Sequence, residues 1–239
     1  MFIELAIVLV IIGVMTWAVS SGFENSSNLR DRERATKLGE VLRESVRAFT
    51  LLNARLPCPD TSGSGWEGDA SGVCASNVES GWFPYRSLGL DRPDTRYLAA
   101  YAVYRRTSAT AESDADTVVR KERTGDAAGT ARYQDGYDLL KALNNAQTDA
   151  LSQSRTRLTG NDSTEGVIDC LTNVRSNPAF LLVLPLSTRG TNTNLFEAPH
   201  GIDSNCAWGP GTAYSQTRDD VVIAESLSTL SGWLSVRTR

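Results

Sequence analysis

Residues 2–13 read Phe-Ile-Glu-Leu-Ala-Ile-Val-Leu-Val-Ile-Ile-Gly, and the apolar run that they begin continues to Val19. The first 22 residues contain 16 apolar side chains and a single charge, on Glu4. At about 1.5 Å per residue, a helix over this stretch is just long enough for the roughly 30 Å hydrocarbon core of a membrane. We therefore expect residues 1–22 to form a hydrophobic segment that lies in lipid or against other helices.

The rest of the chain has the composition of a folded soluble protein. Among the 239 residues, 41% are hydrophobic and 22% are charged, with 24 Lys and Arg against 28 Asp and Glu, a net charge of -4. This composition argues against collagen-like, wholly disordered and multispanning membrane classes. Nucleic-acid binding is not indicated, because it requires clustered cationic surface to replace phosphate counterions.

Residues 23–56 have the pattern of an amphipathic helical stem. Two prolines, Pro57 and Pro59, follow it and are expected to end the helix, so one helix would run from the start of the chain to about Asn53. Its apolar residues recur at steps of three, one, four, three and three, which fit one face of a helix. These residues are Leu38, Val41, Leu42, Val46, Phe49 and Leu52.

Residues 57–239 are expected to form a globular head with β-strands. Strand-like runs occur at 97–104, 180–186 and 221–223, and residues 139–158 resemble a helix or a helical hairpin. The order of these elements predicts an α+β fold. In that fold an antiparallel β-sheet packs on the C-terminal half of the long N-terminal helix.

The four cysteines indicate two disulfides in an exported head. Cys58, Cys74, Cys170 and Cys206 permit three complete pairings, and buried free thiols are the alternative. None forms a Cys-x-x-Cys unit and the chain has one histidine, which argues against zinc. We favour Cys58–Cys74, closing the loop after the stem, and Cys170–Cys206, joining two late loops.

The segment from Phe2 to Gly13 resembles the N-terminal segment of type IV pilins and of the pseudopilins of type II secretion. In that family a precursor is cut after a glycine, the new N-terminal residue is methylated, and a nearby glutamate contacts the amino terminus of a neighbouring subunit. Glu4 matches that glutamate. The resemblance implies a pilin-like fold and assembly through one set of residues. This set is Phe2, Glu4, Leu5, Ile7, Val8, Ile11, Ile12 and Gly13.

The segment also departs from the family in two ways. Only three residues precede Glu4, whereas the family usually has four, and no basic leader ending in glycine is present. Either one mature residue is missing from the start or the cut is shifted by one. Ser20, Ser21 and Gly22 stand where the family often has a proline, and their weak helix preference would let the helix loosen there.

Two other interpretations of residues 1–22 remain open. A secretory signal peptide would have Ala18-Val19-Ser20 as its cleavage site, but an acid stands where a basic region belongs. A plain single-pass anchor would place Glu4 near the lipid headgroups.

A second resemblance lies in the head. Residues 55–60, Arg-Leu-Pro-Cys-Pro-Asp, and residues 81–90, with Trp82, Phe83 and Tyr85 around a proline, are similar to a group of large prepilin-like proteins. This similarity supports pilin-like architecture more than a defined role. The three aromatic side chains are expected in the core or at subunit contacts, with a recognition patch as the alternative.

No catalytic site is expected. The chain contains no Gly-x-Ser-x-Gly, no Walker loop and no His-Glu-x-x-His, and His200 between Pro199 and Gly201 has the setting of a loop residue. No cofactor is required by any motif. Asp203, Asp219 and Asp220 are calcium candidates, with turn or strand-capping roles as the alternative. Some pseudopilins bind calcium in the late loop of the head.

The expected function is that of a structural subunit of a type IV pilus or a pilus-like extracellular filament. The implied partners are identical subunits in a helical polymer, the inner membrane before assembly, and a prepilin peptidase and methylase with the assembly machinery. A pseudopilin or minor pilin of a secretion or uptake machine is the alternative within the family. A membrane-tethered binding module that never polymerises is the alternative outside it.

Overall fold

The computed structural model describes residues 2–125, 134–160, 170–171, 173–186, 195–212 and 219–237. Within the first helix, the side chains of residues 2–9 and 17–28 lie outside this description.

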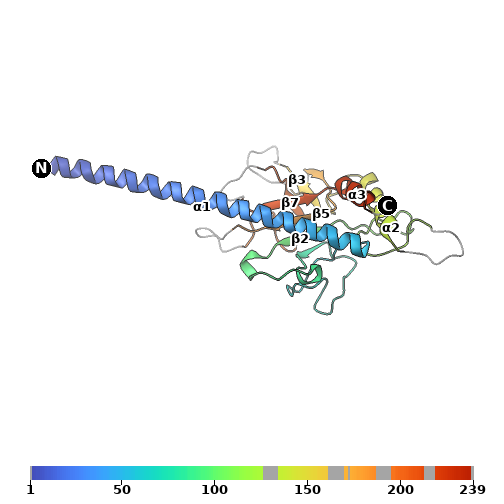
Figure 1. The fold of residues 1–239 in the computed structure, drawn as a ribbon. Coiled ribbons are helices and arrows are strands. Elements are labelled where there is room, and N and C mark those ends of the chain that lie inside the picture. The colour runs from blue at the N-terminus through green and yellow to red at the C-terminus, as the bar shows by residue number, and fades with distance from the viewer. Residues whose placement is uncertain are drawn as a thin grey trace.

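Helix α1 (Phe2–Asn53) is a single element of 52 residues, which corresponds to a length of about 78 Å. Figure 1 shows its N-terminal part extending away from the head and its C-terminal part lying along it. The helix ends where Ala54 adopts a positive φ of 51° and its N–H bonds the carbonyl of Thr50 at 2.9 Å. Pro57 follows within one turn, as expected for a helix terminus.

The main sheet has four antiparallel strands in the order β1-β2-β5-β7. They are β1 (Ser80–Trp82), β2 (Ala100–Val103), β5 (Phe180–Leu184) and β7 (Val221–Glu225). The three strand-like runs in the sequence correspond to β2, β5 and β7. Every residue of β2 and β5 is buried because these central strands are covered on both faces.

A second sheet has the order β4-β3-β6 and contains a parallel pair. Its strands are β3 (Arg157–Thr159), β4 (Val174–Ser176) and β6 (Cys206–Trp208), with β3 antiparallel to β4 and parallel to β6. The predicted antiparallel sheet corresponds to the main sheet, which contacts α1, and the second sheet with its parallel pair was not predicted. The long connection between β3 and β6 allows the chain to return in the same direction, which a short hairpin does not.

Two short helices complete the head beside the end of α1. Helix α2 (Gly136–Thr148) has Asp135 as its N-cap, which forms a capping box with Asp138. Helix α3 (Leu227–Ser235) has Ser226 as its N-cap and contacts α2. The expected helix or hairpin over 139–158 is thus shorter than predicted, because the chain beyond it turns into β3. The short connecting helices η1 (Arg86–Leu88) and η2 (Thr95–Tyr97) precede β2.

The main sheet separates two apolar clusters, so the head has three layers. Alternate residues of β2 face opposite ways: Tyr101 and Val103 belong to the cluster shared with α1, and Ala100 and Ala102 to the cluster shared with β6. The mixed α+β class is therefore confirmed, with helix and second sheet on opposite faces of the main sheet.

The face of α1 that packs on the head differs from the face that the spacing of its large apolar residues predicts. Gly39, Leu42, Val46 and Thr50 are buried, at spacings of three and four. In contrast, the predicted core residues Leu38, Val41 and Leu52 are exposed by 39%, 55% and 84%. The reason is a close approach of the sheet at Gly39, where an added Cβ would lie 2.7 Å from Cγ1 of Ile223 and 3.1 Å from Cδ1 of Leu184.

An ion pair links α1 to β7, the edge strand of the main sheet. Glu225 is 2% exposed and accepts a 2.7 Å hydrogen bond from the Arg47 guanidinium, with Nε of Arg43 at 3.8 Å. Arg47 also binds Glu44 at 2.7 Å on the helix itself. Because one partner is nearly fully buried, loss of the pair would leave a charge without compensation.

Substitution of Gly39 by Leu is expected to lower the free energy of unfolding by about 1–3 kcal/mol, because the new side chain overlaps Ile223 and Leu184. The matched control is Gly232→Leu in α3, where an added Cβ has nothing within 4 Å. Urea denaturation of the full chain in detergent measures both variants. Equal stability of the two would contradict the close approach of α1 to the sheet.

Candidate functional site

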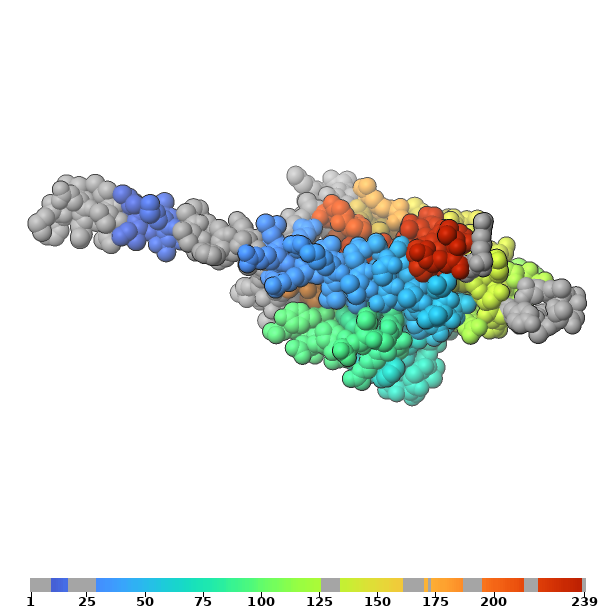
Figure 2. All heavy atoms as spheres, in the orientation of Figure 1, coloured from blue at the N-terminus to red at the C-terminus, as the bar shows by residue number. Residues whose placement is uncertain are grey.

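The first candidate site is the part of α1 that extends beyond the head. In residues 10–16, whose side chains are described, every side chain is exposed, and Val10, Val14 and Met15 are exposed by 65%, 60% and 63%. Figure 2 shows these residues standing well clear of the head. A helix that is apolar all round is normally buried in other helices or lipid. These exposed apolar side chains are therefore a candidate binding surface.

The predicted assembly residues divide between described and undescribed side chains. Ile11, Ile12 and Gly13 are exposed on the projecting helix, and an added Cβ at Gly13 would have nothing within 4 Å. The others have a helical backbone, but their side chains lie outside the described residues. These others are Phe2, Glu4, Leu5, Ile7 and Val8.

Residues 1–22 are the predicted membrane-spanning segment, and most of their side chains lie outside the described part of the structure. Within the described part of the chain, no helix has both the length and the hydropathy needed to cross a membrane.

The helix continues through the residues at which loosening was expected. Ser20, Ser21 and Gly22 lie inside α1 with helical backbone on both sides. Ser and Gly reduce helix stability by up to about 1 kcal/mol each relative to Ala, which a flanking helix of this length tolerates. In the single subunit, therefore, this stretch is helical.

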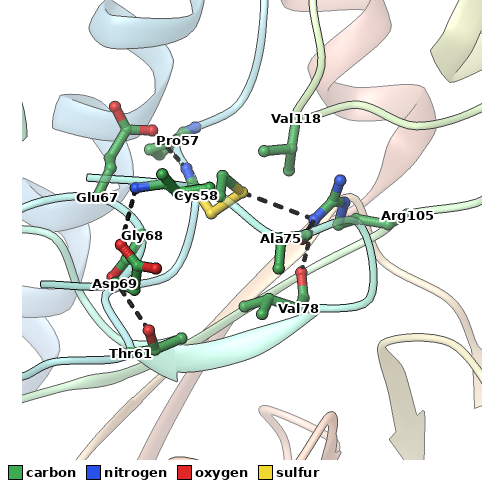
Figure 3. Close-up of a disulfide and its surroundings, with 12 residues drawn as sticks. Pro57, Cys58, Thr61, Glu67, Gly68, Asp69, Ala75, Val78, Arg105 and Val118 are labelled. Atoms are coloured by element: carbon green, nitrogen blue, oxygen red, sulfur yellow. Dashed lines mark hydrogen bonds between the residues drawn. A yellow bond between two sulfur atoms is a disulfide. The ribbon is translucent and has the colours of Figure 1, made fainter. Parts of the chain in front are cut away.

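Both predicted disulfides are present, and the first lies at the junction of stem and head. Cys58 is bonded to Cys74, and Cys170 to Cys206. Figure 3 shows Arg105 reaching the first bridge, where its Nη1 lies 3.6 Å from Sγ of Cys74 and donates to the carbonyls of Ala75 at 2.6 Å and Val78 at 3.0 Å. The bridge therefore closes a loop whose far end is held by a buried arginine.

Other charges hold the same loop. The buried Arg105 forms two hydrogen bonds with Asp116, of 3.0 and 2.7 Å. Arg55 binds Glu67 through two hydrogen bonds of 2.7 and 2.9 Å, and Glu67 also accepts from the N–H of Cys58 at 2.5 Å. Paired, bidentate charges of this kind give fixed geometry. The loop is thus a structural part of the head.

Two of the three candidate aromatic residues belong to the core. Phe83 and Tyr85 are 0% and 2% exposed, and the hydroxyl of Tyr85 accepts from the N–H of Ala99 at 3.0 Å. Trp82 is half-buried and lies 6.0 Å from Phe196, ring to ring, beside an open cavity of about 690 Å³. Core packing therefore accounts for most of this motif.

The second candidate site is a group of carboxylates at the start of β7. Glu197, Asp219 and Asp220 place one oxygen each within 4.8 Å of one another, and the two aspartates are buried. Burial raises the pKa of Asp220 to about 7, and the charge of Asp219 acts in the same direction. Burial and Asp220 also raise the pKa of Glu197. Oxygen donors of this kind suit hard divalent cations.

One of the three predicted calcium candidates does not join this group. Asp203 is exposed and lines the cavity beside Trp82. The third carboxylate of the group, with those of Asp219 and Asp220, belongs to Glu197. Two successive turns separate Glu197 from Asp203, marked by bonds from His200 N–H to the Glu197 carbonyl and from Ser204 N–H to the Gly201 carbonyl. Asp203 lies in the second turn and is exposed.

His200 belongs to the same group, although its sequence setting indicated a plain loop residue. Its Nδ1 lies 2.8 Å from Oδ2 of Asp220, and its ring packs on Trp208 with 3.7 Å between ring centroids. Burial lowers the pKa of His200 to about 3, so the ring is neutral at neutral pH. No local sequence signal identifies His200 or Glu197, because each is more than eighteen residues from Asp219.

Removal of the first disulfide by the double substitution Cys58→Ala and Cys74→Ala is expected to lower the free energy of unfolding by about 3 kcal/mol, because the open loop gains entropy in the unfolded chain. Urea denaturation of the full chain under oxidising conditions checks this value. A loss below about 1 kcal/mol would contradict the stabilising role, since native disulfides in exported domains typically contribute more.

Comparison of the chain with protein-family models, with curated proteins and with solved structures gave no match.

Proposed function

We propose that the protein is a structural subunit of a type IV pilus or a pilus-like extracellular filament, which assembles through its N-terminal helix. The observation that carries the proposal is the exposed apolar surface of residues 10–16 on a helix that extends from a folded head. In water such a surface is unfavourable by about 25 cal/mol per Å² of apolar area. Burial against the same segment of other subunits removes this cost.

The other half of α1 supports this function through its firm attachment to the head. The helix packs on β5 and β7, and Arg47 binds the buried Glu225 of β7. A subunit whose helices form the inside of a polymer needs such an attachment, because the position of the helix then determines the position of the head. Heads held by two disulfides would form the outer surface.

The role of Glu4 follows from the resemblance of residues 2–13 to type IV pilins. Before assembly the tip lies in the inner membrane, where a prepilin peptidase and methylase process it. Assembly then moves the helix from lipid into a bundle of identical helices. Glu4 pairs with the N-terminal amine of a neighbour, and because an unpaired carboxylate among apolar side chains is costly, this pairing selects the register.

Replacement of Glu4 by Ala is expected to reduce the yield of filaments at least tenfold without changing the stability of the head. A loss of about 1.4 kcal/mol in the free energy of each contact between subunits already lowers the association constant tenfold. Filaments are counted by negative-stain microscopy of sheared cell-surface material. The matched control is Glu112→Ala, which removes an exposed carboxylate from a head loop far along the chain. Normal filaments from the Glu4 variant would refute this mechanism of assembly.

The same preparation distinguishes the related functions. Long filaments made chiefly of this chain, with a methylated N-terminal residue in the mass spectrum, support a major pilin. A processed chain found only in trace amounts or in short assemblies supports a pseudopilin or minor pilin. A chain that stays in the membrane fraction as single subunits supports a tethered binding module.

A further inference from the structure

The cavity beside Trp82 lies where the main sheet meets the second sheet. It has a volume of about 690 Å³ and is lined by Trp82 of β1, by Arg157 of β3 and by residues of the loop at 195–205. This loop leads into Cys206, which the second disulfide joins to Cys170. Ligand sites are typically concave and mostly apolar, with a few fixed polar groups. The cavity has this composition and belongs to the head.

Arg157 is a fixed polar group of this cavity, and its side chain is only partly used by the protein. The residue is 9% exposed, and its Nε donates to the carbonyl of Cys170 at 2.8 Å. Its Nη1 donates to Oδ1 of Asn205 at 2.5 Å and to the carbonyl of Arg155 at 3.3 Å. Within the described part of the chain its Nη2 donates to no acceptor, and this nitrogen retains contact with solvent. One end of the guanidinium is therefore available to a ligand.

The charge of Arg157 is compensated only in part. Burial lowers the pKa of Arg157, and the charge of Glu79 opposes this effect incompletely. Glu79 itself forms its salt bridge with Arg155, at 3.1 Å, and accepts from Nδ2 of Asn205 at 3.3 Å. Among the described residues no carboxylate forms a salt bridge with Arg157. A buried cation of this kind favours an anionic ligand group, and a carboxylate matches the planar guanidinium.

Other residues of the cavity suit a hydroxylated ring. Trp82 is half-buried, and its ring centroid lies 6.0 Å from that of Phe196, with 40° between the ring planes. The C–H face of a pyranose ring packs on aromatic rings because their faces are electron-rich. Asp203 is exposed and lines the same cavity, so its carboxylate can accept hydrogen bonds from hydroxyl groups. An aromatic acid has no donor for this acceptor.

We propose that this cavity binds an acidic sugar, in which a pyranose ring carries a carboxylate. The carboxylate accepts from Nη2 of Arg157, the C–H face of the ring packs on Trp82, and hydroxyl groups donate to Asp203. The contact with Arg157 gives the preference for an acid, because hydrogen bonds between charged groups are about twice as strong as neutral ones. The site goes beyond the proposed function, since it lies in the head and does not require polymerisation.

Saturation-transfer NMR tests the site, with glucuronate as the probe and glucose as the neutral comparison. The full chain is kept in a detergent without a sugar headgroup, so that the detergent does not compete for the cavity. We expect saturable binding of glucuronate with a Kd on the order of 1 mM, as is usual for a ligand of this size. Glucose should bind about tenfold more weakly or less, because it has no carboxylate for Arg157.

Substitutions separate the role of the charge from that of the aromatic ring. Arg157→Gln should lower the affinity for glucuronate about tenfold or more and remove the preference for glucuronate over glucose. Trp82→Leu should weaken both sugars by a similar factor and leave the preference unchanged, whereas Trp82→Phe, which keeps an aromatic face, should retain binding. The matched control is Arg86→Gln, which replaces an exposed arginine of η1 and should change neither affinity.

Thermal unfolding of each variant shows whether a loss of binding reflects the site or the fold, since Arg157 also binds Cys170 and Asn205. If Arg157→Gln does not fold, the Trp82 variants and the preference of the unsubstituted chain for glucuronate provide the test. Absence of saturable binding, equal affinity for glucuronate and glucose, or binding of benzoate as tight as that of glucuronate would overturn the proposal. Equal weakening by Arg86→Gln and Arg157→Gln would also contradict it.

Discussion

Close contact between α1 and the main sheet at Gly39 is the interaction on which the arrangement of stem and head depends. Ile223 and Leu184 occupy the space that a side chain would fill, so the helix axis lies near β7 and β5. This approach brings Arg47 within 2.7 Å of Glu225 and buries Leu42 and Val46 in the larger apolar cluster. A bulkier residue would move the helix outward and weaken all of these contacts together.

One helix therefore serves two environments. Its C-terminal half is held by a sheet of its own chain, while residues 10–16 expose apolar side chains in every direction. No part of the described head covers these residues, and the continuous backbone of α1 joins both halves as one rod. The rod couples the position of the head to whatever surrounds the tip, which is the property that a filament subunit requires.

The candidate sites differed in how far local sequence predicted them. The apolar tip and the four cysteines were recognisable because each depends on residue type and order along the chain. Two calcium candidates, Asp219 and Asp220, do lie in the carboxylate group, but Asp203 does not. Glu197 and His200 were missed, since their approach to Asp220 arises from two turns in the loop before β6 and from the pairing of β7 with β5.

By itself the sequence determined the local elements: an apolar tip, a helix that ends before Pro57, and strands where apolar and β-branched residues gather, as in β5 and β7. These follow from neighbours within a few residues. Only the tertiary structure decided which face of α1 is buried, with Gly39 inside and Leu38 exposed, and that β3 pairs in parallel with β6. Both depend on contacts between segments far apart in the chain, where the close fit of backbones and the route of long connections outweigh local hydrophobicity.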